Sequence, residues 1–500
     1  MSYVQDSRTN IKILGDYTFK FLKSILPVVS IPEIKKIIPI FSLFFFIAFV
    51  YHILRCLKIT LIVKADGSGA QVIPFIKFWL VMPSAIVFTY LYAILARHNN
   101  RKILIYNILG IFSVFFILFA LFLYPNKEQL RFDFLCDFLF YHLPKNFHGI
   151  IPILFHWPEA IFYIMAEMWS IIVLSILFWG FCNEITKIED AKRFYALIAL
   201  GANCAGIFSG KFMQFISKYV ASSWEHSVSI FMITVISSCF FIVIIFMKLN
   251  NAHTLDTSSD IMTDQVLPRT EKSKHKISLS ESIKYIFRYK YIALLAIIVI
   301  TYNIVFNLAD VLWIDQLNIR FASASELNNY LAQLDFLVGI FSLIIGIFIF
   351  TNMMKKFGWT ITAMLPPVVW LITSIALYST IFTEKFGFDL NNIILILGTL
   401  QISLGKALKY CIFDQIKEMS FIPLSIEQQR NSKAIIDGII SRFGKSSSSI
   451  ILQVILIFGF SEISTAIPII ALLIIITIAV WCYATCKIGT RIKNNNLINN

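Results

Sequence analysis

Charged side chains interrupt several long apolar stretches of this sequence. Arg55 and Lys58 lie in one such stretch, Glu167 in a second and Asp310 in a third. An ionised side chain near the centre of a membrane-spanning helix costs about 2.5–3.5 kcal/mol, so it usually faces a cavity or a partner of opposite charge. These residues are therefore the first candidates for contacts with a substrate.

The last third of the chain holds more charges of this kind. A mixture in which basic groups predominate suits a polyphosphate, because ammonium and guanidinium groups bind phosphate oxygens while carboxylates return the empty site to near neutrality. The alternative for Lys406, Lys409 and Lys417 is that they lie near helix ends and reach the membrane surface, or pair with Asp414 and Glu418. The residues predicted to bind substrate are Lys58, Glu167, Asp310, Lys417, Arg55, Arg442 and Lys445.

Signatures of enzymes are missing from the sequence. The string Gly444-Lys445-Ser446 resembles part of a P-loop, but Gly438 is one position too far away for G-x-x-x-x-G-K-S and no strand precedes it. Neither H-E-x-x-H nor G-x-S-x-G occurs. We therefore predict no catalytic residue, metal site or cofactor. The aromatic residues near Glu167, including Tyr163 and Trp169, are expected to serve packing more than base stacking.

The composition places these charges in a membrane protein. Of 500 residues, 58% are hydrophobic and 14% are charged, and the mean hydropathy of +0.77 is far above that of a water-soluble domain. The net charge of +14 would suggest a nucleic-acid partner in a soluble protein. In a membrane protein Lys and Arg gather in cytoplasmic loops for topological reasons, so a lipid bilayer and not a nucleic acid is the expected partner.

Apolar runs of the length needed to cross about 30 Å of hydrocarbon recur along the whole chain. They predict an all-α integral membrane protein with about twelve transmembrane helices. The expected spans are residues 37–62, 73–96, 103–123, 159–181, 194–217, 228–248, 291–313, 331–351, 360–382, 391–411, 434–459 and 466–486.

The connecting segments differ in their Lys and Arg content. About 28 basic residues fall on the side of both termini and about seven on the other, which predicts that both termini are cytoplasmic. The segment 125–157 is then external, and its Cys136 is expected to react with a membrane-impermeant thiol reagent. Residues 1–36 carry acidic groups and no convincing signal or transit sequence, so we expect a bacterial inner membrane.

A polar stretch divides the chain into two similar parts. We predict an N-terminal segment (1–36), a first six-helix half (37–248), a cytoplasmic linker (249–290), a second half (291–487) and a tail (488–500). The fifth helix of the first half holds Gly201, Gly206 and Gly210, and its counterpart holds Gly438 and Gly444. Parallel halves of this kind are typical of major-facilitator-like transporters, which bind substrate between the halves.

Several motifs resemble those of the non-mitochondrial ATP/ADP antiporters, the nucleotide translocases of plastids and intracellular bacteria. The segment Ile53-Leu-Arg-Cys-Leu-Lys-Ile-Thr-Leu61 is similar to the first-helix motif of this family, and Ala166-Glu-Met-Trp169 to part of the fourth. Asn307-Leu-Ala-Asp-Val-Leu-Trp313 is similar to the seventh, and Lys409 to Leu424, with Arg442-Phe-Gly-Lys-Ser446, to the tenth and eleventh. The resemblance extends from about Ile37 to Lys487.

The resemblance implies that Lys58, Glu167, Asp310 and Lys417 take part in transport. All four were also selected by the cost of burying a charge in a span. The sequence departs from the family pattern at Ile59, Asp310, Ile314 and Gln415, which leaves the identity of the nucleotide open.

The expected function is nucleotide exchange by alternating access, with ATP, ADP or another nucleoside phosphate as substrate. Two alternatives remain at this stage. One is a transporter of a different anionic metabolite, and the other is a membrane enzyme or a non-transporting sensor. The sequence specifies no oligomeric state.

Overall fold

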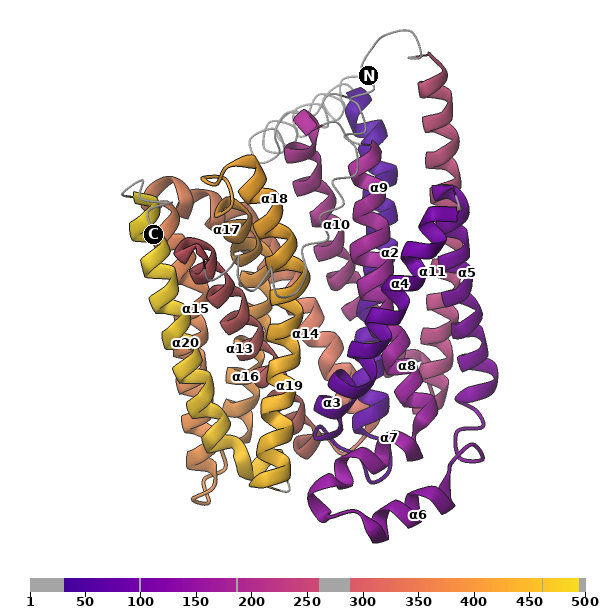
Figure 1. Cartoon of the computed structure of the whole chain (residues 1–500). Coiled ribbons are helices and arrows are strands. Elements are labelled where there is room, and N and C mark those ends of the chain that lie inside the picture. Colours follow the sequence, from indigo (N-terminus) through magenta and orange to yellow (C-terminus); the bar gives the residue numbers. More distant parts are fainter. Residues whose placement is uncertain (1–30, 99, 186–187, 260–287, 461, 494–500) are drawn as a thin grey trace, which may run out of the picture.

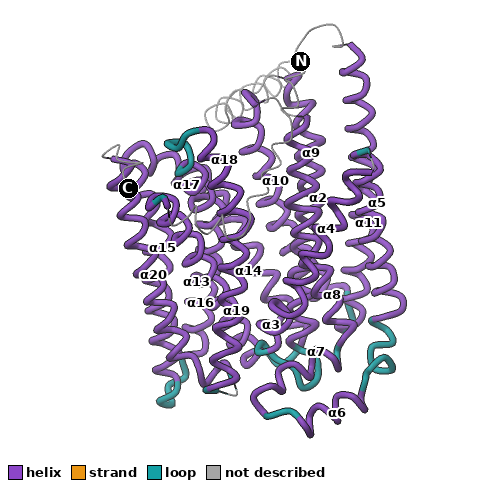
Figure 2. The backbone as a smooth tube through the Cα atoms, in the orientation of Figure 1, coloured by secondary structure: helices purple, strands orange, loops and turns teal. Residues whose placement is uncertain are grey.

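The computed structural model describes residues 31–98, 100–185, 188–259, 288–460 and 462–493. Within these ranges the chain is helical, with short turns between helices and no strand (Figure 2). Helices predominate because the bilayer core holds no water to satisfy exposed backbone groups. The fold class predicted from the sequence is confirmed.

The first half contains the helices α2 to α11. Its elements are α2 (Ile31–Val63), α3 (Val72–Phe75), the π-helical η1 (Ile76–Val81), α4 (Met82–His98), α5 (Arg101–Leu118), η2 (Phe119–Leu123), α6 (Asp133–His142), η3 (Lys145–Ile150), α7 (Ile151–Phe155), α8 (Trp157–Met168), η4 (Trp169–Leu177), α9 (Phe178–Ile185), α10 (Ile188–Phe215), η5 (Ile216–Val220) and α11 (Trp224–Ser259).

The second half contains α13 to α20. Its elements are α13 (Lys290–Arg320), α14 (Ala324–Ile344), η6 (Ile345–Phe350), α15 (Thr351–Glu384), α16 (Asn391–Leu408), η7 (Lys409–Phe413), α17 (Asp414–Met419), α18 (Ile426–Ile435), η8 (Ile436–Ile440), α19 (Ser441–Phe458) and α20 (Ile463–Lys493).

Ten helical stretches of the described chain are long and apolar enough to cross a membrane, judged by length and composition. The other two expected spans, 194–217 and 434–459, are also helical, in α10 and in η8 with α19. They are more polar than the ten: α10 holds Asn203 and Lys211, and α19 holds Arg442, Lys445 and a run of serines. Each is the fifth span of its half, so the polar helices occupy equivalent places.

The two halves stand side by side, as Figure 1 shows, with α13 to α20 on the left and α2 to α11 on the right. We call the side where α2 begins and α20 ends the terminal face, and the side where α6 lies across the ends of the spans the α6 face. The halves meet where α10 and α2 contact α14, and where α3 and η1 contact α19.

Two boundaries differ from the sequence prediction. Helix α11 continues through Ser259, beyond the expected start of the linker at residue 249, and α20 continues to Lys493, beyond the expected start of the tail at 488. Polar side chains end an apolar run but they do not end a helix, because their backbone groups still bond within it. The remainder of the linker, 260–287, lies outside the described residues.

Candidate functional site

An ion pair joins the first and fourth spans of the first half. The Nζ atom of Lys58, on α2, lies 2.5 Å from Oε1 of Glu167, on α8. Lys58 is buried, and its ammonium group also lies 5.0 Å from the centre of the Tyr163 ring. A buried cation of this kind needs a carboxylate or a ring face to replace water, and Lys58 has both.

A second ion pair joins the first and fourth spans of the second half. Nζ of Lys406, on α16, lies 3.5 Å from Oδ1 of Asp310, on α13. Lys406 is buried and lies 5.8 Å from the centre of the Phe306 ring. The alternative that Lys406 reaches the membrane surface is therefore wrong, whereas Lys409 and Lys417 do pair with Asp414 and Glu418, at 3.4 and 3.6 Å.

The two pairs occupy equivalent places with opposite polarity. In the first half the base lies on the first span and the acid on the fourth, and in the second half the acid lies on the first span and the base on the fourth. A π-helical segment follows each fourth-span residue closely, η4 after Glu167 and η7 after Lys406. The wider turn of a π-helix redirects the side chains around it and is frequent at functional sites.

Arg55 makes a different contact from Lys58, although the two residues are about one turn apart on α2. Its Nη1 atom donates to Oδ1 of Asp335, on α14 of the other half. The charge of Asp310, on α13, also acts on Arg55. Arg55 therefore joins the two halves.

Two further lysines bring positive charge to the same region. Lys445 lies in the fifth span of the second half, and Lys77 lies in the second span of the first half. The charge of Lys445, on α19, acts together with those of Glu167, Lys77 and Lys409. Lys445 is exposed, and the charged groups that act on it belong to both halves. Lys77, in η1, donates to Oδ1 of Asn307 at 3.3 Å. Neither lysine has a carboxylate within ion-pair distance among the described residues.

Arg442 and Lys417 lie apart from the two central pairs. Arg442 is exposed on α19, and no hydrogen bond or ion pair of its side chain is seen in the part of the chain that the structure describes. Lys417 pairs with Asp437 at 2.6 Å and with Glu418, both of the second half. The structure therefore does not bring these two predicted residues to Lys58, Glu167 and Asp310.

Three polar residues of this region were not selected from the sequence: Asp335, His52 and Lys77. Asp335 lies inside the expected span 331–351, so the cost of placing a charge in a span could have found it. Lys77 and His52 carry weaker signals, because Lys77 is close to the end of its expected span and a histidine, unlike a lysine or an aspartate, need not carry a charge. Within the described residues, no three His, Cys, Asp or Glu side chains gather as a metal site would require.

The charged side chains that interact electrostatically around the two ion pairs include more bases than acids. The bases come from both halves, which is the arrangement expected of a site between them. The bases are Arg55, Lys58, Lys77, Lys406, Lys409 and Lys445, and the acids are Glu167, Asp310, Asp335 and Asp414. We call this set the central cluster.

Comparison with known proteins identifies the family. The sequence model of the TLC ATP/ADP transporter family matches residues 15–492. The chain belongs to this family. It is 37% identical over 485 residues to ADP,ATP carrier protein 1 of Chlamydia trachomatis, covering 94% of this chain and 91% of that protein. It is 34% identical over 476 residues to ADP,ATP carrier protein 1, chloroplastic, of Arabidopsis thaliana, covering 91% and 74%.

Solved structures of transporters share the fold of this TLC family chain. A crystal structure of the nucleoside transporter NupG matches with a TM-score of 0.57 at 12% identity, covering 91% of this chain and 99% of that one. A POT family transporter in complex with 5-aminolevulinic acid matches with a TM-score of 0.57 at 10% identity, covering 93% and 99%. At these identities the likeness concerns the fold. The protein is a multi-pass membrane protein of a transporter family.

Proposed function

We propose that the protein exchanges ATP, ADP or another nucleoside phosphate across its membrane by alternating access. The observation that carries this proposal is the basic excess of the central cluster, to which both halves contribute. A site between two halves can be opened to either side in turn as the halves rock, without covalent chemistry. Membership of a family named for ATP/ADP transport, and relatives named ADP,ATP carriers, support this substrate class.

The lysines without carboxylate partners are the natural first ligands of the phosphates. Lys445 and Lys77 have no carboxylate at ion-pair distance among the described residues, so a polyphosphate can bind them without first breaking an ion pair. Lys58 and Lys406 are held by Glu167 and Asp310, and phosphate oxygens can exchange for these carboxylates. The acids keep the empty cluster near neutrality, which lowers the cost of holding its bases inside the protein before substrate binds.

The decisive experiment measures counter-exchange in liposomes that carry the purified protein. Uptake of labelled ATP or ADP is compared with and without unlabelled nucleotide inside, and the internal label is then identified chemically. We expect uptake that depends on internal nucleotide and a label that is chemically unchanged, whereas an enzyme would release product. If no nucleoside phosphate is taken up or competes, the assignment is wrong. An arm with inorganic phosphate and simple organic anions distinguishes a carrier of another anion.

We also propose that the membrane is the inner membrane of a bacterium and that the terminal face is cytoplasmic. The excess of Lys and Arg on the side of the termini supports this orientation. Several of the hydrogen bonds that join the halves lie towards the α6 face. Lys64 donates to the backbone oxygens of Asn318 and Phe321, and Gln453 bonds to Pro74 and Trp79. With α6 outside, this arrangement is closed to the exterior.

A further inference from the structure

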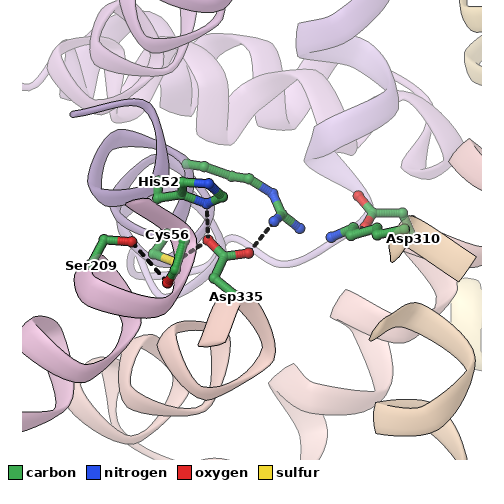
Figure 3. Close-up of polar contacts among 8 residues, drawn as sticks. His52, Cys56, Ser209, Asp310 and Asp335 are labelled. Carbon is green, nitrogen blue, oxygen red and sulfur yellow. Dashed lines mark hydrogen bonds and ion pairs between the residues drawn. The ribbon is translucent and has the colours of Figure 1, made fainter. Parts of the chain in front are cut away.

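One carboxylate at the boundary between the halves receives donors from a single helix. Asp335, on α14, is 1% exposed, and its three side-chain partners all belong to α2: Arg55 donates to Oδ1, Nδ1 of His52 lies 3.0 Å from Oδ2, and Sγ of Cys56 donates to Oδ2 at 3.6 Å. Figure 3 shows His52 and Cys56 beside Asp335. A buried carboxylate is tolerated when donors replace its lost water, so this contact is costly to pull apart.

The same stretch of α14 also lies in close backbone contact with α10. A Cβ atom at Gly210 would come within 2.5 Å of the carbonyl oxygen of Ala332, and one at Gly339 within 2.8 Å of that of Asn203. Only residues without a side chain allow two helices to approach this closely. Helices α2, α10 and α14 therefore meet at a closely packed point between the halves, which we call the junction.

The depth of the junction differs from that of the Lys64 bonds between the halves. Asp335 lies eleven residues after Ala324, where α14 begins, which is about 16 Å along the helix and about half of a 30 Å hydrocarbon core. The bonds from Lys64 to Asn318 and Phe321 lie instead at the helix ends, where water can replace them. When two bodies rock, points near the axis move least and points at the ends move most.

We propose that the junction is the pivot of alternating access and that Asp335 is its positioning residue. The contact of Asp335 with His52 and Arg55 persists in both the inward-open and the outward-open arrangement. Arg55 is then held by the pivot and is not a ligand of the phosphates, in contrast to the role predicted from the sequence. This inference rests on the proposed function, because it assigns the axis of the movement that carries the nucleotide.

Distances between spin labels test the pivot in the otherwise unchanged carrier, after its accessible cysteines have been replaced. One pair lies beside the junction, at the exposed residues Phe208 of α10 and Gln333 of α14. The matched pair lies at the α6 face, at the exposed residues Asp66 and Ile319. The two distances are measured in nanodiscs with and without ADP. We expect ADP to change the distance between the labels beside the junction by less than about 2 Å, and to change the distance between the labels at the α6 face by more than about 2 Å. A junction pair that moves as far as the end pair, or an end pair that stays fixed while exchange proceeds, overturns the proposal.

Variants test the role of Asp335 itself. Asp335→Asn keeps the shape of the side chain and removes its charge, and we expect the maximal exchange rate to fall at least tenfold while the Kd for ADP changes less than threefold. Arg55→Lys keeps a cation at the junction and should retain more exchange than Arg55→Gln at an unchanged Kd. A variant of Arg55 that loses ADP binding would show that Arg55 is a ligand and overturn its assignment to the pivot. Absence of exchange in the parent would instead contradict the proposed function, whereas the label distances test the pivot alone.

Discussion

Lys58 and Glu167 depend on each other because both are placed inside the membrane. From the sequence alone, Lys58→Gln is expected to leave folding intact, since it removes a charge that is costly to insert. The structure changes this expectation, because the substitution leaves Glu167 without its partner at 2.5 Å. Breaking one side of a buried ion pair costs about 3–5 kcal/mol, whereas removing both sides is often neutral.

We therefore predict that Lys58→Gln lowers both stability and exchange. The double variant Lys58→Gln/Glu167→Gln should recover the thermal stability of the purified protein and remain defective in exchange. Thermal unfolding in detergent and counter-exchange in liposomes measure the two effects separately. A double variant with normal exchange would exclude the pair from the substrate site. A single variant as stable as the parent would mean that the ion pair contributes nothing to the fold.

Lys445 offers a test of phosphate binding that does not disturb an ion pair. We predict that Lys445→Gln weakens ADP binding about tenfold to a hundredfold, the equivalent of one lost charge-assisted hydrogen bond of about 1.5–3 kcal/mol. Arg442→Gln is the matched control, because it removes a positive charge one turn away on the same helix. Its effect on the Kd should be less than threefold. Equal effects of the two substitutions would indicate a general influence of charge and not a contact with phosphate.

The choice of candidate residues was possible from the sequence, but their pairing was not. Glu167 and Asp310 are found by the cost of a charge in a span, and the same rule applied to span 331–351 would have found Asp335. Which base meets which acid depends on the neighbours of each helix, and the hydropathy pattern contains no information about neighbours. For this reason Arg55 was predicted to bind the same ligand as Lys58, whereas the structure turns it towards α14.

At the scale of elements, α6 shows how a correct span prediction can still give a poor probe. Cys136 was expected to react with an impermeant reagent, but it is 3% exposed on α6. Burial, and then the nearby charges of Asp133 and Asp137, raise the pKa of the Cys136 thiol. The thiolate is the reactive form, so both effects slow the reaction. The labelling of Cys136 stays a prediction, and its slow rate makes this residue a poor probe of orientation.

We predict that Tyr141→Cys, at a position of α6 that is 86% exposed, is labelled in intact cells much faster than Cys136. An ordinary cysteine is already half ionised at about pH 8.5. Because the pKa of Cys136 is raised, the rate at which Cys136 is labelled should continue to rise above that pH. Lys433→Cys, at an exposed position towards the terminal face, should react only after the cells are opened. Labelling of Lys433→Cys but not of Tyr141→Cys in intact cells would reverse the proposed orientation.

The helices themselves could be predicted because span length and hydropathy are set by the bilayer. The details that position the site could not. The π-helical segments η4 and η7 have no hydropathy signal, since they change the backbone register without changing the composition. The crosswise direction of α6 is also absent from the pattern, because a short amphipathic segment in a loop is not constrained to cross the membrane.

At the scale of the whole molecule, the arrangement of the two halves depends on a few polar contacts at the α6 face. Lys64 extends from the end of α2 to two backbone oxygens of the other half, those of Asn318 and Phe321. These bonds exist only while the halves are closed at this face. A contact that is made only in the closed arrangement stabilises that arrangement by the free energy of the contact. It does not change the free energy of the open arrangement, so it shifts the equilibrium towards the closed one.

Lys64→Gln should therefore shift the carrier towards the arrangement that is open at the α6 face. The ammonium group makes two bonds to carbonyl oxygens, and the loss of one such charge-assisted bond is about 1.5–3 kcal/mol, so a change of at least tenfold in the ratio of the two states is expected. Spin labels at Asp66 and Ile319 measure this ratio as the fraction of long distances. Lys127→Gln is the control, since Lys127 lies over the ring of Tyr124 within the first half and makes no contact between the halves. A fraction of long distances that is unchanged by Lys64→Gln would show that these bonds do not hold the face closed, and the closure would then depend on the contacts of Gln453 with Pro74 and Trp79.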